Sequence, residues 1–132
     1  MKVLRNKDTG NFFVRYLKSF CHAINGIVYT VLHEHNMIII LLAIFVTTIA
    51  GFYFQIKTYE WLFCIASFGA VSASEMINTA IEAAIDLETG KMHPLAKIAK
   101  DTASSATLIL SVTACIGAIL IFTPYIQEII HS

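Results

Sequence analysis

The feature that most constrains this chain is a set of long segments without charged residues. Met37–Phe54 is one such segment, and Thr102–Gln127 is another. A helix needs about 20 mostly apolar residues to cross the hydrocarbon core of a bilayer, so each segment can span a membrane once its flanks are counted. A third segment, Trp61–Leu87, begins apolar and ends polar. The sequence therefore predicts an integral membrane protein of the all-α class.

The composition supports a membrane class. The chain has 132 residues, of which 57% are hydrophobic and only 14% are charged. A soluble domain of this size needs more charge to cover its surface. The formal net charge is +0, so the overall charge gives no indication of a nucleic-acid partner, and we expect none. The length suits one domain, and we predict a single membrane domain over 1–132.

A further helix is expected ahead of the first span. From Phe12 to Leu32, apolar side chains recur at spacings of three and four residues, with basic side chains between them. This is the helical period, and a basic helix that also bears aromatic residues often lies in the bilayer interface. We expect Pro124 to end or kink the last span. The predicted elements are an amphipathic surface helix and three transmembrane helices, over 12–33, 36–55, 61–87 and 95–123.

The distribution of Lys and Arg predicts an orientation. Five of these residues precede the first span and three follow the second, whereas Lys57 stands alone in the loop between the two. Cytoplasmic loops of membrane proteins carry the excess of Lys and Arg. We therefore expect the amino terminus and the second loop to be cytoplasmic. Glu34 and the polar half of the second span then lie on the same side of the membrane.

Polar side chains gather on one face of the second predicted span. Glu75 is followed at offsets of three, four, seven and eleven residues by Asn78, Thr79, Glu82 and Asp86. These offsets place all five on one helix face. Unpaired acids at this depth are costly, so they must face protein, water or a cation. Because the helix carries no matching Lys or Arg, positive charge has to come from elsewhere.

Two sources of positive charge are available. Mg²⁺ prefers carboxylate oxygens and keeps coordination positions open for phosphates. Lys100, beside Asp101, stands at the start of the third span, and Glu34 adds a fourth carboxylate at the same membrane level. Acids, a metal ion and a lysine near a cytoplasmic interface suit the binding of a Mg-nucleotide. The sequence contains no GxxxxGK[ST] motif, so such a site would not be a P-loop.

Two other interpretations of the acids stay open. Acidic stripes also mark proton and cation pathways, although the first and third spans are almost purely apolar and offer no continuous polar route. The acids could instead pair with Lys and Arg in a structural oligomer. Three spans cannot enclose a site for both a nucleotide and a lipid, so we expect a homo-oligomer that packs the polar faces inward. Small residues on the second and third spans allow such close contact.

Two segments match a known family. EMINTAIEAAIDL (Glu75–Leu87), followed by HPLAKIAKD (His93–Asp101), strongly resembles the prokaryotic diacylglycerol kinase family, and within it the undecaprenol kinases of Gram-positive bacteria. SFCHAINGI (Ser19–Ile27) and Glu34 also fit, and the resemblance covers nearly the whole chain. It implies a homotrimer in the inner (plasma) membrane of a bacterium, with active sites shared between neighbouring subunits on the cytoplasmic side.

The resemblance also implies an activity and a set of site residues. The implied reaction is transfer of the γ-phosphoryl group of ATP, with Mg²⁺ as cofactor, to the hydroxyl of a membrane lipid alcohol. Glu75 matches the catalytic base of the family, and Glu34 and Glu82 match its metal-binding acids. Arg15, Glu75 and Ser104 fall at lipid-side positions. The positions near the nucleotide are Arg15, His22, Glu34, Asn78, Glu82, Asp86, Lys91, His93, Lys100 and Asp101.

The chain departs from the family at two of these positions. His22 stands where the family usually has tyrosine against the nucleotide, and Lys91 stands where an acid is common, so nucleotide preference is the property most affected. The expected acceptor is undecaprenol, which would give undecaprenyl phosphate. Diacylglycerol is the alternative acceptor within the family. Outside enzymes, the alternative is a small structural or transport oligomer in the membrane.

Overall fold

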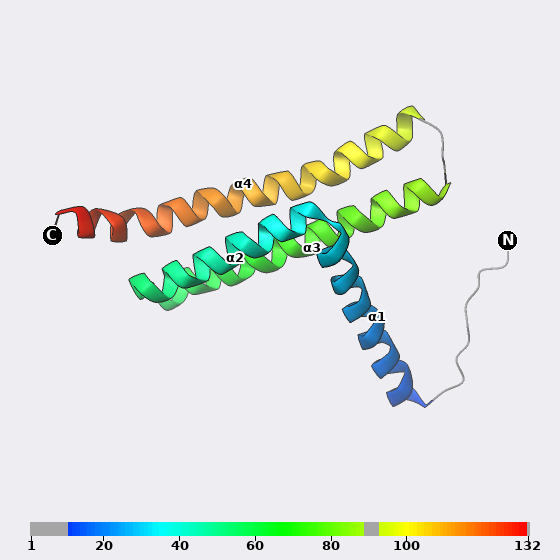
Figure 1. Ribbon diagram of the computed structural model, residues 1–132, viewed down its shortest axis with the longest axis horizontal. Helices are drawn as coiled ribbons and strands as arrows, with labels where there is room; N and C mark the ends of the chain where they lie inside the picture. The colour runs from blue at the N-terminus through cyan, green and yellow to red at the C-terminus, as the bar shows by residue number, and fades with distance from the viewer. Residues whose placement is uncertain (1–10, 89–92, 132) are drawn as a thin grey trace.

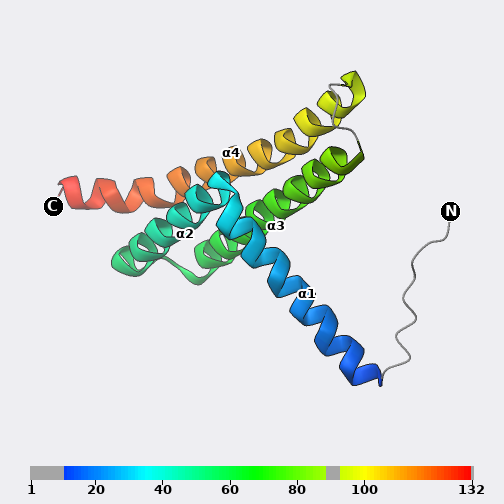
Figure 2. The same cartoon turned by 45° about the vertical axis from the view of Figure 1, so that its right-hand side comes forward.

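The computed structural model of the protein describes residues 11–88 and 93–131. Within these ranges the chain forms four helices, three of which are long and apolar enough to cross a membrane. The three are α2, α3 and α4, and they lie side by side, whereas α1 leaves them at a large angle (Figures 1 and 2). The helices are α1 (Phe12–His33), α2 (His35–Phe54), α3 (Thr58–Glu88) and α4 (Pro94–His131). The all-helical class with three potential spans is therefore confirmed.

The first helix has the bounds that the apolar period predicts. Large side chains near its amino-terminal end, such as Phe12 and Tyr16, are exposed, whereas Thr30 near its carboxyl-terminal end is buried. Figure 2 shows the corresponding arrangement, with the amino-terminal half of α1 extending away from α2, α3 and α4. Its position on a bilayer surface stays a prediction.

Short connections join the first three helices. Glu34 has extended backbone angles (φ −102°, ψ 115°), which end α1 and let α2 begin in a new direction. Gln55 ends α2 in the left-handed region (φ 52°), where its N–H bonds back to the carbonyls of Gly51 and Phe52. This left-handed end satisfies carbonyls that the helix would otherwise leave unpaired.

The second span begins earlier than predicted, at Thr58 instead of Trp61. The carboxylate of Glu60 accepts a hydrogen bond of 2.7 Å from the N–H of Lys57. Glu60 is the third residue of α3, and Lys57 is the residue before the helix. A side chain at the third position that accepts a bond from the N–H of the preceding cap residue satisfies a backbone donor that the helix leaves free, and it stabilises the first turn. Thr58–Glu60 therefore belong to α3, although the sequence predicts that they lie in the loop between two spans.

Pro124 is expected to end or kink the last helix, and the helix does not end there, because α4 continues to His131. A proline inside a helix removes one backbone hydrogen bond, and tertiary contacts can offset that loss. Here the hydroxyl of Tyr125 donates a hydrogen bond of 2.6 Å to Glu60 of α3. The Tyr125 ring also lies 6.0 Å from the ring of Phe54, centroid to centroid. These contacts with α2 and α3 stabilise α4 beyond the proline.

The three spans also pack through small residues, and a further polar contact joins α3 to α4. The side chain of Trp61 covers Gly51, where an added Cβ would lie 2.8 Å from the indole ring. The ring of Phe63 occupies the space in front of Gly117 so closely that a Cβ there would overlap it. Ser74 and Thr107 hydrogen-bond across α3 and α4 at 2.8 Å. The outer faces remain apolar and exposed, as helices that face lipid or further subunits require.

Candidate functional site

Glu75 lies in the middle of α3 and is the most deeply buried carboxylate that the structure describes. Its exposed fraction is 0%. Neither carboxylate oxygen accepts a hydrogen bond of standard geometry from residues 11–88 or 93–131. Asn36 of α2 and Thr107 of α4 nevertheless lie close enough to interact with the carboxylate. Burial of a carboxylate without a full set of hydrogen bonds is costly, so Glu75 needs a polar or charged partner beyond those that residues 11–88 and 93–131 supply.

The predicted polar face of α3 continues one turn beyond Glu75. Asn78 and Thr79 are both buried, with exposed fractions of 5% and 7%. The Asn78 side-chain N–H donates to Glu82 at 3.1 Å, and the Thr79 hydroxyl donates to the Glu75 carbonyl at 3.0 Å. The Asn78 side-chain oxygen, like the Glu75 oxygens, is buried without a partner among the described residues. Two adjacent turns of α3 therefore present unsatisfied polar atoms.

The polar face opens to solvent toward the Glu88 end of α3. Glu82 is half-buried and Asp86 is exposed. Glu34, at the junction of α1 and α2, is half-buried, and both Glu34 and Glu82 act electrostatically on Glu75. Three carboxylates from two parts of the chain therefore converge where α1, α2 and α3 meet.

Glu34 and Glu82 can supply part of a metal site, but the described residues do not form a complete one. Among the residues that the structure describes, no group of three or more His, Cys, Asp or Glu side chains is arranged to hold a metal ion. Mg²⁺ does not need such a cage, because it usually binds through one or two carboxylates together with substrate phosphates and water. The oxygen atoms of Glu34 and Glu82 are ligands of the right kind for this ion.

Lys100 is the cation of α4 that pairs with this polar face. Its ammonium group lies 2.5 Å from Asp86 and joins α4 to α3. The side chains of Lys100 and Asp86 are 35% and 65% exposed. Ion pairs this open to water contribute little to stability, so an anionic ligand can take the place of Asp86 at low cost.

Other predicted site residues stabilise the first turns of α4. The ring of His93 accepts a hydrogen bond of 3.2 Å from the N–H of Leu95, directly across Pro94 at the first helical position. Such a cap satisfies a free N–H at the helix start. The Asp101 carbonyl accepts hydrogen bonds from the hydroxyls of Ser104 and Ser105 at 3.3 and 2.6 Å. Contacts of these residues with nucleotide or lipid stay predictions.

Two of the predicted site residues, Arg15 and His22, lie on α1. Arg15 lies in the first turn of α1 and His22 near its middle, and both are exposed. The amino-terminal half of α1 extends away from the other helices (Figure 2). Lys91 lies outside the described residues. Roles for Arg15 and His22 at this site stay predictions.

The sequence did not reveal three polar neighbours of Glu75. Two of them, Asn36 of α2 and Thr107 of α4, interact with the carboxylate, and the third, Ser74, precedes Glu75 in the chain and is hydrogen-bonded to Thr107. Asn36 and Thr107 are isolated polar residues at or inside apolar runs. A single polar residue in an apolar segment can have a purely structural role. Neither Asn36 nor Thr107 by itself therefore indicates that the two residues contribute to one site.

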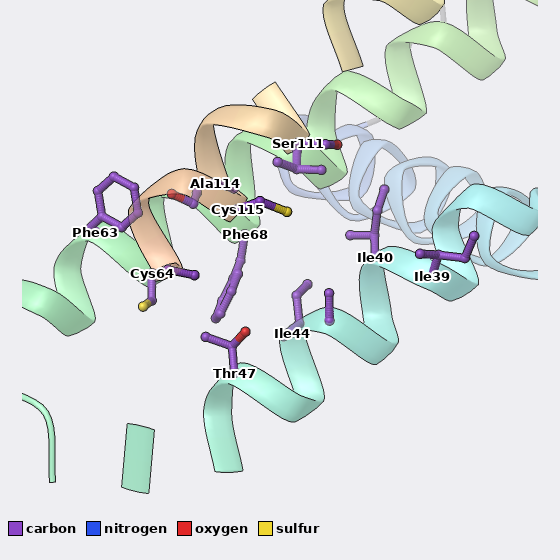
Figure 3. A pocket seen from close by; sticks show the side chains of 14 residues that line it. Ile39, Ile40, Ile44, Thr47, Phe63, Cys64, Phe68, Ser111, Ala114 and Cys115 are labelled. Atoms are coloured by element: carbon purple, nitrogen blue, oxygen red, sulfur yellow. The ribbon is translucent and has the colours of Figure 1, made fainter. Parts of the chain in front are cut away.

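A half-open apolar pocket with a volume of about 190 Å³ lies between α2, α3 and α4. It is on the side of Glu75 opposite to Asp86, toward the start of α3. Figure 3 shows side chains from all three helices around it. Its walls include Ile40 and Ile44 of α2, Phe63 and Phe68 of α3, and Ala114 and Cys115 of α4.

Comparison with known proteins identifies the family. Residues 21–122 match the prokaryotic diacylglycerol kinase family. The chain belongs to this family. The resemblance carried by the Glu75–Leu87 and His93–Asp101 segments is thereby confirmed.

Individual members of the prokaryotic diacylglycerol kinase family are similar to this chain over segments of different length. The undecaprenol kinase of Bacillus subtilis (strain 168) is 40% identical over 119 residues, which cover 90% of this chain and 97% of that protein. The diacylglycerol kinase of Helicobacter pylori (strain J99) is 42% identical over 71 residues, covering 54% of this chain and 55% of that protein. A diacylglycerol kinase of a Synechocystis species is 44% identical over 55 residues, which cover 40% of this chain and 31% of that protein.

Proposed function

We propose that this member of the prokaryotic diacylglycerol kinase family transfers the γ-phosphoryl group of ATP to the hydroxyl of a membrane lipid alcohol. The observation that carries the proposal is the fully buried carboxylate of Glu75, whose two oxygens have no hydrogen-bond partner among the described residues. A general base has to lie within hydrogen-bond reach of the proton that it removes. The hydroxyl of a lipid is a partner that can approach this carboxylate from the membrane.

The neighbouring residues supply what phosphoryl transfer needs. This reaction depends on positioning and charge neutralisation more than on covalent participation of the protein. Glu34 and Glu82 would hold Mg²⁺, whose charge offsets that of the ATP phosphates. Lys100 would exchange Asp86 for a phosphate oxygen, and the Asn78 amide would orient the nucleotide from the buried side.

In this mechanism Glu75 accepts the proton of the acceptor hydroxyl as its oxygen attacks the γ-phosphorus. The new bond joins the lipid oxygen to phosphorus, and the bond from phosphorus to the bridging oxygen of ADP breaks. The bond electrons leave with ADP, and Glu75 later releases its proton to solvent. Because the polar face runs from buried Glu75 to exposed Asp86, lipid and nucleotide can reach the site from opposite ends.

The proposed acceptor is undecaprenol, and the product is undecaprenyl phosphate. The relative that this chain matches over nearly its full length is named an undecaprenol kinase, whereas two relatives named diacylglycerol kinases match over about half of this chain or less. Diacylglycerol, with phosphatidic acid as the product, is the second candidate.

We further propose that the enzyme is a homotrimer in the inner membrane of a bacterium, with its amino terminus and active sites facing the cytoplasm. Arg15 and His22 lie on an arm that points away from the Glu75 of the same chain, so a neighbouring subunit would complete each site. The exposed apolar faces of α2 and α4 support contact with lipid or with further subunits.

Phosphate transfer from labelled ATP tests the proposal directly. The purified protein in lipid micelles is offered undecaprenol and diacylglycerol separately and in competition, with and without Mg²⁺. Labelling of undecaprenol that requires Mg²⁺ and exceeds labelling of diacylglycerol supports the proposal. Preference for diacylglycerol keeps the mechanism and changes the acceptor. No labelling of either lipid by folded, trimeric protein contradicts the kinase function and favours a structural or transport oligomer.

A further inference from the structure

We propose that Asn36, Thr107 and Ser74 are positioning residues, which hold the carboxylate of Glu75 in the orientation needed to take the proton of the acceptor hydroxyl. This inference rests on the proposed kinase function and makes it more specific. It assigns the three side chains a role that they exert through Glu75, without contacts of their own to the nucleotide or the metal ion.

The polar side chains of α3 that follow Glu75 on the same face are engaged with other groups. The side-chain amide of Asn78 donates to Glu82 at 3.1 Å, and the hydroxyl of Thr79 donates to the backbone carbonyl of Glu75 at 3.0 Å. The carboxylate of Glu75 is fully buried, and a buried charge without donors is costly. Within the described part of the chain, donors for its two oxygens therefore have to come from other helices.

Two other helices supply such donors. Asn36 lies in the first turn of α2 and the buried Thr107 lies in α4, and the side chains of both interact with the carboxylate. An amide N–H and a hydroxyl can each donate to a carboxylate oxygen. Neither contact has standard hydrogen-bond geometry, and hydrogen bonds at active sites are often long until the substrate binds. We expect both contacts to shorten when the acceptor hydroxyl reaches Glu75.

Ser74 sets the direction of the Thr107 hydroxyl. The two hydroxyl oxygens lie 2.8 Å apart, and either can be the donor. A hydroxyl group has one hydrogen to donate and can accept at its oxygen. When Ser74 donates to Thr107, the hydrogen of Thr107 is available for Glu75. The half-buried Ser74 therefore supports the carboxylate indirectly, through α4.

Donors on two helices restrict the rotation of the carboxylate. A misplacement of about 1 Å at a reacting group can cost about 10²-fold in rate, so the supporting hydrogen bonds act mainly on kcat. Loss of one hydrogen bond to a charged group corresponds to roughly 10- to 100-fold. The lone pairs that Asn36 and Thr107 leave free are those that can accept the proton of the acceptor.

Removal of one donor at nearly constant size tests the role of Asn36. Asn36→Leu removes the amide, and Asn25→Leu makes the same change at an exposed position of α1. We expect Asn36→Leu alone to lower kcat for transfer to undecaprenol by roughly 10- to 100-fold, with KM for ATP unchanged. The Mg²⁺ concentration that half-activates transfer should also stay unchanged. A shift in this concentration without a loss of kcat would mean that Asn36 acts through Glu34, two residues away, and would overturn the inference.

Conservative substitutions test the two hydroxyl groups. Thr107→Ser keeps the hydroxyl and should retain most of the activity. Ser74→Ala removes the donor to Thr107 and should lower kcat, again with KM for ATP unchanged. If Ser74→Ala has the kcat of the unsubstituted protein, the role of Ser74 is overturned.

A double-mutant cycle shows whether Asn36 acts through the carboxylate. Glu75→Gln removes the base, so the orientation of this side chain no longer limits the residual transfer, which labelled ATP can follow. We expect Asn36→Leu to cause no further loss in that background, because residues that act as a unit are non-additive. A full additional loss would show that Asn36 acts elsewhere and would overturn the inference.

Nuclear magnetic resonance tests the contact without any kinase activity. The chain contains five asparagines, so protein with ¹⁵N-labelled asparagine in micelles gives few side-chain amide signals, and the signal that Asn36→Leu removes is that of Asn36. We expect Glu75→Gln to shift this signal and Glu60→Gln, at the far end of α3, to leave it in place. An unshifted signal in Glu75→Gln would overturn the inference.

The outcomes separate the positioning role from the kinase function. If Asn36→Leu does not fold, Asn36→Ala replaces it in both measurements. Normal transfer to undecaprenol by a folded Asn36 variant overturns this inference alone. A shifted amide signal without phosphate transfer by the unsubstituted protein overturns the kinase function, and the positioning role with it.

Discussion

The hydroxyl groups of Ser74 and Thr107 lie 2.8 Å apart and join α3 to α4 one residue before the buried Glu75. Both Thr107 and Asn36 act on the Glu75 carboxylate. The contact therefore does two things: it holds two spans together, and it fixes the environment of the carboxylate.

Thr107→Val should weaken both the fold and the activity. Valine keeps the shape of threonine but cannot bond to Ser74, and hydrogen bonds between membrane helices contribute about 0.6 kcal/mol on average and up to about 1.7. We expect the free energy of unfolding in detergent to fall by an amount in that range, with a lower kcat and an unchanged KM for ATP. Thr113→Val is the matched control, because the exposed Thr113 hydroxyl bonds within α4 to the Ile109 carbonyl. Equal effects of the two substitutions would show that the contact between α3 and α4 has no special role.

Glu75→Gln should abolish most of the turnover and spare nucleotide binding. Glutamine has nearly the same shape but cannot accept the hydroxyl proton, and general bases contribute about 10²- to 10⁴-fold to rates. We expect kcat to fall within that range while equilibrium ATP binding persists. Glu60→Gln is the control on the same helix, since Glu60 bonds to Tyr125 at the far end of α3. Its expected effect is on stability. Near-normal turnover of Glu75→Gln would exclude Glu75 as the base.

Glu82→Gln should raise the Mg²⁺ requirement. The substitution removes a charged ligand, while the Gln carbonyl can still accept the hydrogen bond from Asn78. Loss of even an indirect partner of a metal site costs roughly 10- to 100-fold in affinity. We expect at least this increase in the Mg²⁺ concentration that half-activates phosphate transfer. The exposed Glu88 lies on the same helix, and Glu88→Gln should leave the Mg²⁺ titration unchanged. Parallel shifts in both variants would instead indicate a general effect of charge.

Lys100→Gln should raise KM for ATP without a matching loss of stability. The exposed ion pair with Asp86 contributes little to folding. Loss of a hydrogen bond from the charged Lys100 to a phosphate should change KM by roughly 10- to 100-fold. Lys97→Gln removes an exposed charge from the preceding turn of the same helix and serves as the control. If the unfolding free energy of Lys100→Gln falls but KM for ATP does not change, Lys100 serves the structure alone.

The sequence predicts the helices well where the signal is local. The bounds of α1 follow from the recurrence of apolar residues, and those of α2 follow from a run without charges to within one residue. The continuation of α4 past Pro124 is not expected from the local sequence, and it is accompanied by a contact of Tyr125 with Glu60, 65 residues away in sequence. No feature of the residues next to Pro124 reports this contact.

For the candidate site, too, the sequence predicts the features that depend on local spacing and does not predict those that depend on helix packing. The spacing of Glu75, Asn78 and Glu82 is enough to place them on one face of a helix. Burial of Glu75 between Asn36 and Thr107 depends on how three helices pack, so the sequence reveals the acid but not its neighbours. The apolar pocket next to it has no sequence signature, since Ile, Phe and Ala are ordinary residues of a membrane span.

Gly117→Ala should destabilise the packing of α3 against α4. An added Cβ would overlap the ring of Phe63, so the ring or the helix would have to move. Overpacking of this kind costs about 1–3 kcal/mol. Gly69→Ala is the matched control, because nothing lies within 4 Å of the Cβ it would add. Alanine there should be neutral or should stabilise the helix by about 0.5–1 kcal/mol.

The double variant Phe63→Ala, Gly117→Ala identifies the cause of the loss. If the clash with the ring is responsible, the cost of Gly117→Ala should disappear once the ring is removed, and the two substitutions should be non-additive. Unfolding in detergent, followed by circular dichroism, measures all four proteins. Full stability of Gly117→Ala, equal to that of Gly69→Ala, would mean that α3 and α4 do not approach each other this closely.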